Sequence, residues 1–248
     1  MTRSSPTVAV IAGSGVTEHF ELSREETLTT KFGTATVFSS RDGGFLVLPR
    51  HGPGHGIPPH RIDYRANIAA LKSVGVRTII ATSAVGSMNR RFRVGELGLV
   101  NQFLDFTKGR QGTFYDDTVA HTDMTNPYSR EVNKLVLRAA KSLGLRVHDG
   151  LVYVCAEGPR YETAAEIRMF RLLGGDVVGM TGVPEVVLAN EMGISYVSVV
   201  IATNWAAGIQ EKVSHEEVMR VMKKGGESVK RLVEATVNLL GGGGRGGE

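Results

Sequence analysis

The sequence is poor in cysteine, because Cys155 is the only one among 248 residues. A single thiol excludes an intramolecular disulfide framework, and its place inside an apolar run is typical of a buried core thiol. The sequence also contains no long uncharged apolar segment and no signal-peptide pattern, so nothing in it indicates a membrane span or export. We therefore expect a cytoplasmic protein that does not insert into a membrane.

A strong excess of charge of either sign is missing too. The chain carries 29 Lys and Arg residues against 25 Asp and Glu residues, which gives a net charge of +4, and the basic residues are scattered. Without a basic run interleaved with aromatic residues, binding to nucleic acid is not indicated. No linker-like stretch interrupts the interior, so we expect one domain over residues 1–240, followed by a glycine-rich, disordered tail at 241–248.

The two common glycine-rich nucleotide motifs are absent as well. A β-type run at residues 7–12 ends at Gly13-Ser14-Gly15, whose unhindered amides and hydroxyl suit an anion. Glu18 stands where a dinucleotide fingerprint has its third glycine, and no Gly-Lys-Ser/Thr follows as in a P-loop. The motif therefore indicates either a plain strand-to-loop turn or a small anion loop.

The sequence does contain a loop rich in glycine, proline and basic side chains at residues 47–64. Its glycines and prolines cannot continue the preceding strand or begin a helix, so we expect a surface turn. This turn gathers Arg50, His51, His55, His60 and Arg61. Guanidinium and imidazole donors favour an oxyanion, with phosphate as the main candidate. A solvated basic loop is the alternative, and a metal site is a third, although the loop supplies only a single carboxylate.

Apolar strand-like runs and amphipathic helical segments predict an α/β protein. Strands are expected at residues 7–12, 31–37, 45–48, 77–82, 98–106, 146–156, 177–180 and 194–203, and helices at 64–74, 129–143, 164–173, 184–192 and 215–240. The polar stretch at 107–128, which contains His121, is too long for a simple connection. It indicates a functional or subunit-contacting loop.

Three further groups follow predicted strands. Residues 83–87, Ser-Ala-Val-Gly-Ser, form another small-residue loop at a strand end, where ligands gather in open α/β sheets. Tyr161 and Glu162 stand at a strand-to-helix junction, where they can stack on and hydrogen-bond a planar ligand, unless Glu162 is a first-turn acid of the helix. Asn204 follows the 194–203 strand, either as a turn former or as an amide that reads a heterocycle.

Together these motifs resemble the trimeric purine nucleoside phosphorylase and methylthioadenosine phosphorylase family. The resemblance runs from the Gly-Ser-Gly turn to the last helix, through Leu-Pro-Arg-His-Gly, Tyr-Arg-Ala-Asn, Ser-Ala-Val-Gly-Ser, Glu-Gly-Pro-Arg-Tyr-Glu-Thr and Gly-Met-Thr-Gly-Val-Pro-Glu. It implies a single α/β domain with a mixed, partly barrel-like central sheet flanked by helices. It also implies a homotrimer, with a hexamer as the alternative, and active sites near the subunit contacts.

The resemblance assigns residues to three parts of an active site. Its phosphate site comprises Ser14, Arg50, His51, Ser83, Thr181 and, through a backbone amide, Ala84. Tyr161 and Met180 match positions that pack on the base and ribose, and Glu162 and Asn204 match positions that read the purine edge. His215 matches a residue that contacts the 5′-hydroxyl, and His121 one that a neighbouring subunit lends to the 5′ pocket.

The chemistry that the resemblance implies is phosphate-dependent cleavage of a purine nucleoside to free purine and ribose 1-phosphate. It needs no cofactor and no metal, because inorganic phosphate is the co-substrate and the nucleophile. Asn204, at N7 of the departing base, and His51, at the phosphate, are the residues expected to be catalytic.

The base-reading pair separates the branches of this family. Methylthioadenosine enzymes carry a small residue in place of Glu162 and an Asp in place of Asn204. A carboxylate accepts from the N1–H of a 6-oxopurine, whereas adenine has no donor there. Together with His215, this pair favours inosine or guanosine. The Arg-His-Gly, Ser-Ala-Val-Gly-Ser and Tyr-Arg-Ala-Asn motifs resemble the methylthio branch more closely, so cleavage of methylthioadenosine or methylthioinosine is the alternative.

Overall fold

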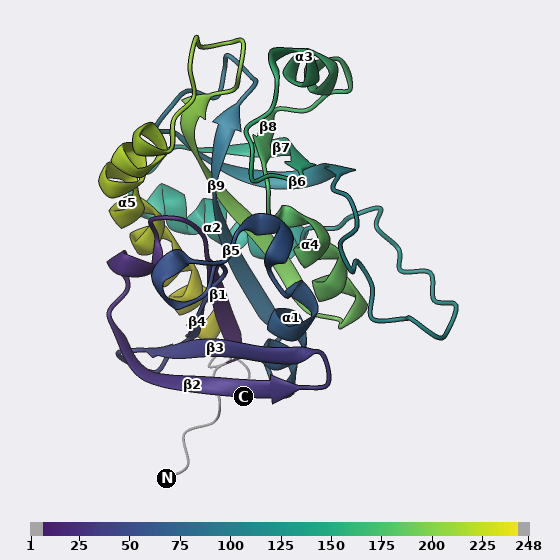
Figure 1. Cartoon of the computed structure of the whole chain (residues 1–248). Helices are drawn as coiled ribbons and strands as arrows, with labels where there is room; N and C mark the ends of the chain where they lie inside the picture. Colours follow the sequence, from purple (N-terminus) through teal and green to yellow (C-terminus); the bar gives the residue numbers. More distant parts are fainter. Residues whose placement is uncertain (1–6, 243–248) are drawn as a thin grey trace.

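The computed structural model describes residues 7–242, which form a nine-stranded mixed sheet with helices on both of its faces (Figure 1). The strands are β1 (Val8–Ala12), β2 (Leu22–Thr30), β3 (Gly33–Ser40), β4 (Leu46–Pro49), β5 (Thr78–Ser87), β6 (Leu97–Phe106), β7 (Val147–Ala156), β8 (Val177–Gly179) and β9 (Ser195–Trp205). The helices are α1 (Tyr64–Ser73), α2 (Arg130–Ser142), α3 (Ala164–Leu172), α4 (Gly182–Glu191) and α5 (His215–Gly242).

Part of this sheet closes into a barrel. The strand order is β2-β3-β4-β1-β5-β8-β7-β6-β9, and β9 also pairs with β5, so five strands from β5 to β9 form a ring. β1 extends the sheet by pairing parallel to both β5 and β4, and β2 and β3 add an antiparallel hairpin at the edge. The prediction of a single α/β domain with a mixed, partly barrel-like sheet is confirmed.

Two hydrophobic cores lie on opposite faces of the sheet. One core packs α1 and α4 against the strands through buried residues such as Ile68 and Val186. The other packs α2 and α5 through residues such as Val136 and Leu232. Each helix presents an apolar stripe to the sheet, so burial of that stripe holds the helices and leaves the strand ends open for a site.

Three expectations about the elements are wrong. β2 was not predicted, because its side chains are mostly exposed and polar, as an edge strand allows. Residues 83–87 are not a loop but the second half of β5, which runs through Ser87. Gly241 and Gly242 continue α5, and the rest of the expected glycine-rich tail lies outside the described residues.

Within residues 7–242, no helix combines the length and the apolar character that a membrane crossing requires.

Candidate active site

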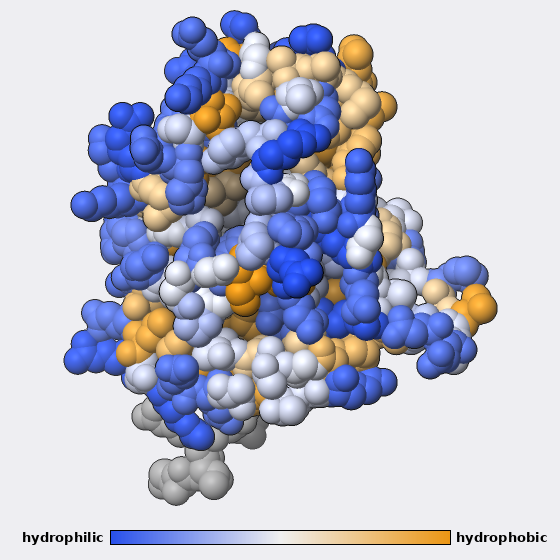
Figure 2. Space-filling model, viewed as in Figure 1, coloured by the Kyte–Doolittle hydropathy of each residue, from blue (hydrophilic) through white to orange (hydrophobic). Residues whose placement is uncertain are grey.

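A cavity of about 600 Å³ opens where the carboxyl ends of β1, β4 and β9 meet β5 and β8. In Figure 2 the face that carries it is hollowed near its centre, and the rim is mostly hydrophilic. Eleven sequence-predicted site residues line the cavity: Ser14, Arg50, His51, Ser83, Ala84, Tyr161, Glu162, Met180, Thr181, Asn204 and His215. The fold thus brings together side chains that are separated by up to two hundred positions in the chain.

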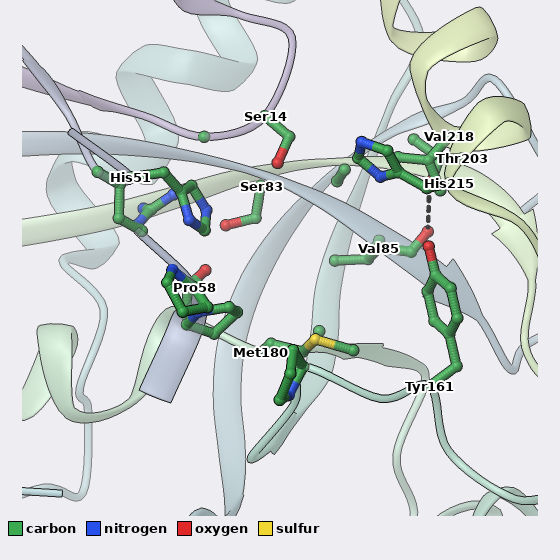
Figure 3. A pocket seen from close by; sticks show the side chains of 18 of the residues that line it. Ser14, His51, Pro58, Ser83, Val85, Tyr161, Met180, Thr203, His215 and Val218 are labelled. Atoms are coloured by element: carbon green, nitrogen blue, oxygen red, sulfur yellow. Dashed lines mark hydrogen bonds between the residues drawn. The ribbon is translucent and has the colours of Figure 1, made fainter. Parts of the chain in front are cut away.

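One end of the cavity is lined by small hydroxyl groups. In Figure 3 the hydroxyls of Ser14 and Ser83 point into a common space beside the His51 ring. Ser83 and Thr181 are both buried, and among the described residues neither hydroxyl has a protein hydrogen-bond partner. Donors that are held in place but unused by the protein are what an oxyanion requires.

Arg50 reaches this end from beneath, and it does not lie on a surface turn as expected. The side chain is 1% exposed, and its Nε and Nη2 donate to the two carboxylate oxygens of Glu185 at 2.7 Å each. Nη1 donates to the Thr82 carbonyl at 2.8 Å. Because a guanidinium has five N–H donors, these bonds leave one N–H on Nη1 and one on Nη2 for a ligand.

His51 lines the same end as a neutral side chain. Its Nδ1 lies 2.8 Å from the Ile57 carbonyl oxygen, which can only accept, so Nδ1 carries the proton and Nε2 is left as an acceptor. Burial lowers the pKa of His51 to about 4, despite the hydrogen bond to Ile57. At neutral pH, the Nε2 of His51 therefore offers a ligand an acceptor, whereas the sequence predicted an imidazole donor.

His55 lines the cavity, although it was not among the residues that the resemblance assigned to the active site. Its Nε2 lies 3.2 Å from the Ser14 hydroxyl, and its ring centroid is 4.4 Å from that of His51. Burial and the neighbouring His215 lower its pKa. The signal was present, because His55 belongs to the basic loop, whereas His60 and Arg61 of the same loop do not line the cavity.

The other end of the cavity is lined by an aromatic ring, a thioether and a carboxyl group. Tyr161 and Met180 lie across the cavity from Ser14 and His51 in Figure 3. Glu162 precedes Thr163, the N-cap of α3, so it is not a first-turn acid of that helix, a place that Glu166 takes. The Glu162 Oε1 atom is buried without a hydrogen-bond partner, and burial raises the pKa of this carboxyl group.

Asn204 lies within β9, one residue before its end, and its amide is oriented by neighbours. Its Nδ2 donates to the Trp205 carbonyl at 2.9 Å, and its Oδ1 accepts from the Thr203 hydroxyl at 3.0 Å. These bonds fix which end of the amide is the oxygen. One N–H and one lone pair remain, so Asn204 can donate to one ring atom and accept from another.

The two histidines assigned to the 5′ end differ in position. His215 begins α5 and lines the cavity beside Val218, and Figure 3 shows both at the same side of the cavity as Tyr161. His121 is exposed in the loop that leads from β6 to α2, which extends away from the body at the right of Figure 1. It does not line the cavity of its own chain.

The described residues offer little for a metal or for a thiol nucleophile. Among them, no group of three or more His, Cys, Asp or Glu side chains is placed to hold a metal ion. Cys155 is fully buried, and burial raises the pKa of its thiol to about 12. Its Sγ contacts the backbone of Val183 at 3.5 Å and 3.4 Å, so this thiol packs the barrel wall behind Thr181.

Comparisons with known proteins agree with this geometry. The family model described as the Phosphorylase superfamily matches residues 7–238. A 6-oxopurine nucleoside phosphorylase from Pyrococcus furiosus is 48% identical, with 95% of this chain and 93% of the relative covered. A probable S-methyl-5′-thioinosine phosphorylase from Methanothermobacter thermautotrophicus is 45% identical over 94% of this chain and 84% of the relative.

A solved structure shares the fold as a whole. It is methylthioadenosine phosphorylase from Schistosoma mansoni in complex with tubercidin, which superposes with a TM-score of 0.90 at 33% sequence identity. The match covers 96% of this chain and 92% of that chain.

Proposed function

The chain belongs to the phosphorylase superfamily, and we propose that it cleaves 6-oxopurine nucleosides of the inosine and guanosine type with inorganic phosphate. The products are the free purine and ribose 1-phosphate. The proposal is supported by a cavity with hydrogen-bond donors for an anion at one end and groups for a planar base at the other. The 6-oxopurine nucleoside phosphorylase from Pyrococcus furiosus is the relative whose name agrees with it.

The observation that carries the choice of base is the unpartnered Oε1 of Glu162. A buried carboxylate oxygen without a donor costs free energy unless a ligand supplies one. A 6-oxopurine brings an N1–H to that oxygen, whereas adenine brings a lone pair. Asn204 also distinguishes the base, because its remaining N–H can donate to O6 and the remaining lone pair of its oxygen can accept from a protonated N7.

The proposed reaction uses the phosphate itself as the nucleophile. The hydroxyls of Ser14, Ser83 and Thr181, the Ala84 amide and the free N–H groups of Arg50 donate to phosphate oxygens, and the phosphate hydroxyl donates to Nε2 of His51. As the glycosidic bond lengthens, positive charge builds on the ribose and negative charge on the purine. The phosphate stabilises the first electrostatically, and Asn204 at N7 stabilises the second. This scheme requires no cofactor and no metal.

A second candidate differs only at the 5′ end of the sugar. Methylthioinosine is also a 6-oxopurine nucleoside, so Glu162 and Asn204 fit it equally well. Val218 offers an apolar wall beside His215, and the relative from Methanothermobacter thermautotrophicus is named for that activity. A 5′-hydroxyl hydrogen-bonds to His215, whereas a methylthio group would pack on Val218 and leave the imidazole unpartnered.

The proposal also covers the oligomeric state of the protein and its location in the cell. We infer a cytoplasmic homotrimer, with a hexamer as the alternative, in which His121 of one subunit reaches the 5′ end of a neighbour's cavity. The partners are then small molecules, namely nucleoside and phosphate, with no nucleic acid and no membrane.

A panel of inosine, guanosine, adenosine, methylthioinosine and methylthioadenosine, assayed with and without phosphate, tests the reaction and the substrate together. We expect inosine and guanosine to be cleaved only when phosphate is present. Cleavage without phosphate would contradict the reaction, and a higher kcat/KM for methylthioinosine than for inosine would favour the second candidate. Equal cleavage of adenosine and inosine would remove the role given to Glu162 and Asn204.

A further inference from the structure

At the phosphate end, Arg50 forms an ion pair with a carboxylate that lies behind the cavity wall. Glu185, on α4, does not line the cavity and is fully buried, and it meets Arg50 through two parallel hydrogen bonds of 2.7 Å. Tyr196 donates a third hydrogen bond of 2.7 Å to the Oε1 of the same carboxylate. Burial alone would lower the pKa of Arg50, but the charge and hydrogen bonds of Glu185 raise it above its ordinary value.

The rest of the phosphate end carries no fixed positive charge. Among the described residues that line the cavity, Arg50 is the one arginine, and there is no lysine. The His51 ring is neutral at pH 7, and the pKa of His55 is lowered as well. With its cation offset by a carboxylate, this end offers oriented N–H and O–H donors but little net charge to an entering anion.

We propose that Glu185 is a positioning residue that holds the Arg50 guanidinium against the phosphate and cancels its charge, so that bound phosphate keeps its negative charge for the ribose. This inference rests on the proposed function, because it concerns the transition state of phosphorolysis. Geometry carries it, since the pair is bidentate, buried and directly behind the donors of the phosphate end.

The benefit of neutrality follows from the difference between ground state and transition state. An uncompensated guanidinium attracts the phosphate dianion strongly before reaction, which tightens binding. In the transition state the same positive charge repels the developing ribose cation and draws on the phosphate charge that should stabilise it. Only interactions that are stronger in the transition state raise kcat. A neutralised arginine therefore binds phosphate less tightly but allows a higher kcat.

Glu185→Gln tests this, because it removes the countercharge and keeps a side chain of nearly the same shape. We expect the Kd of inorganic phosphate for the resting enzyme, measured by calorimetry, to fall about tenfold, while kcat at saturating phosphate and inosine falls about tenfold. A purely structural role does not tighten phosphate binding while it lowers kcat. A folded variant whose phosphate affinity is unchanged or weaker would overturn the proposal.

Glu191→Gln is the matched control. Glu191 ends the same helix and receives the same chemical change, but its carboxylate accepts from Thr113 and from the Phe114 amide, outside the cavity. We expect its phosphate Kd to stay within about twofold of wild type. A tenfold gain in phosphate affinity in this variant as well would show that the effect is not specific to the Arg50 pair.

Competition by nitrate on the wild-type enzyme decides the matter if Glu185→Gln does not fold. A planar monovalent anion fits a free guanidinium fork but has little attraction to a neutralised one. At constant ionic strength, we expect nitrate at about 0.1 M, near the ionic strength of common buffers, to change the Kd of phosphate less than about twofold. Strong competition would refute the neutralised site. Both binding arms proceed without turnover, so an enzyme that binds phosphate but cleaves no nucleoside would refute only the proposed function.

Discussion

At the scale of single residues, the base end is built around a carboxyl group in an unfavourable place. Glu162 is mostly removed from water, and its Oε1 has no protein partner. Burial disfavours the charged form, which raises the pKa, and a purine N1–H offsets part of that cost when it binds. The group is therefore most useful when ionised, and its ionisation is sensitive to pH.

The first prediction follows from the direction of that shift. Because the pKa of Glu162 is raised, protonation begins at a higher pH than for an ordinary glutamate with a pKa of about 4.3. As the pH falls, the acceptor for N1–H is lost, so kcat/KM for inosine should fall on an acid limb that lies above that value. A pH profile of wild type and Glu162→Gln measures it. If the acid limb of Glu162→Gln lies at the same pH as that of wild type, a group other than Glu162 is titrating.

The second prediction concerns Asn204→Asp. An aspartate there would be as buried as Asn204 is, and burial raises the pKa of a carboxyl group, which favours its protonated form. A carboxylic acid donates to N7 and accepts from a 6-amino group, so the ratio of adenosine to inosine cleavage should rise at least about tenfold. Competing both nucleosides in one assay measures the ratio. An unchanged ratio would mean that Asn204 does not read the 6-position.

The third prediction concerns stability. The pKa of His51 is about 4 in the folded state and about 6.5 when unfolded, so the unfolded chain binds the proton more tightly between these values. The free energy of unfolding should therefore fall by up to about 3 kcal/mol as the pH drops from about 6.5 to about 4. Urea unfolding of wild type and His51→Gln isolates this loss as the difference between their pH curves. The exposed His60→Gln should follow wild type.

The sequence supplied most of the site but not its electrostatics. Ser14 and Ser83 stand in small-residue motifs at predicted strand ends, which indicated possible anion loops, and the family resemblance assigned them and Thr181 to a phosphate site. The pairing of Arg50 with Glu185 joins positions 135 apart in the chain and depends on how α4 packs against α1 and β9. No local pattern reports such a contact, and Arg50 was consequently predicted to be exposed. The proton on Nδ1 of His51 likewise depends on a carbonyl placed by the turn of the loop.

At the scale of elements, β5 and β9 carry the two ends of the cavity side by side. Gly86 of β5 pairs with Asn204 of β9, where the register between these parallel strands shifts. A Cβ at Gly86 would lie 3.2 Å from Asn204 Nδ2 and 3.2 Å from Val178 Cγ1. The small residues at 83–87, taken for a loop from sequence, are thus strand residues that let side chains of neighbouring strands approach. β2 escaped prediction for the opposite reason, since its one-sided pairing imposes no apolar pattern.

The fourth prediction uses that close approach. Gly86→Ala should push the Asn204 amide away from the base and raise KM for inosine about tenfold. The effect on KM for phosphate should be smaller, because the Ser14, Ser83 and Thr181 hydroxyls are not among the nearest neighbours of the new methyl group. Gly56→Ala is the control, because Gly56 also lines the cavity but has open space around its Cβ direction. Equal effects of both substitutions would contradict the steric argument.

At the scale of the whole molecule, the loop between β6 and α2 stands out from the body. Its base is tied down, because Arg65 donates to Asp116 and Glu191 accepts from Thr113. Its outer part, including His121, is exposed and far from its own cavity lining. A large apolar patch also lies exposed on and beside α3, with Met169, Leu172 and Leu173 at 41%, 88% and 54% exposure, at the upper right of Figure 2. Both features are consistent with contacts between copies of the chain.

The fifth prediction tests the lending of His121 between subunits. His121→Ala and Asn204→Ala proteins should each have low activity, and mixing them under conditions that allow subunit exchange should regenerate some intact cavities. The recovered rate is measured against each variant incubated alone. A mixture no more active than the sum of its parts, or a fully active monomer on dilution, would place His121 outside the reaction.

The closed barrel also fixes the distance between the two ends of the cavity. In the proposed complex, Ser83 and Ala84 of β5 contact the phosphate and Asn204 of β9 contacts the base. The pairing of these two strands sets the distance between the two positions, at about 3.3 Å for each residue along a strand. No loop movement can alter that spacing. A change in the distance between ribose and base should therefore be tolerated less well than a change at the 5′ carbon. The 5′ carbon of the proposed substrate instead faces side chains outside this ladder, namely His215 and Val218 at the start of α5.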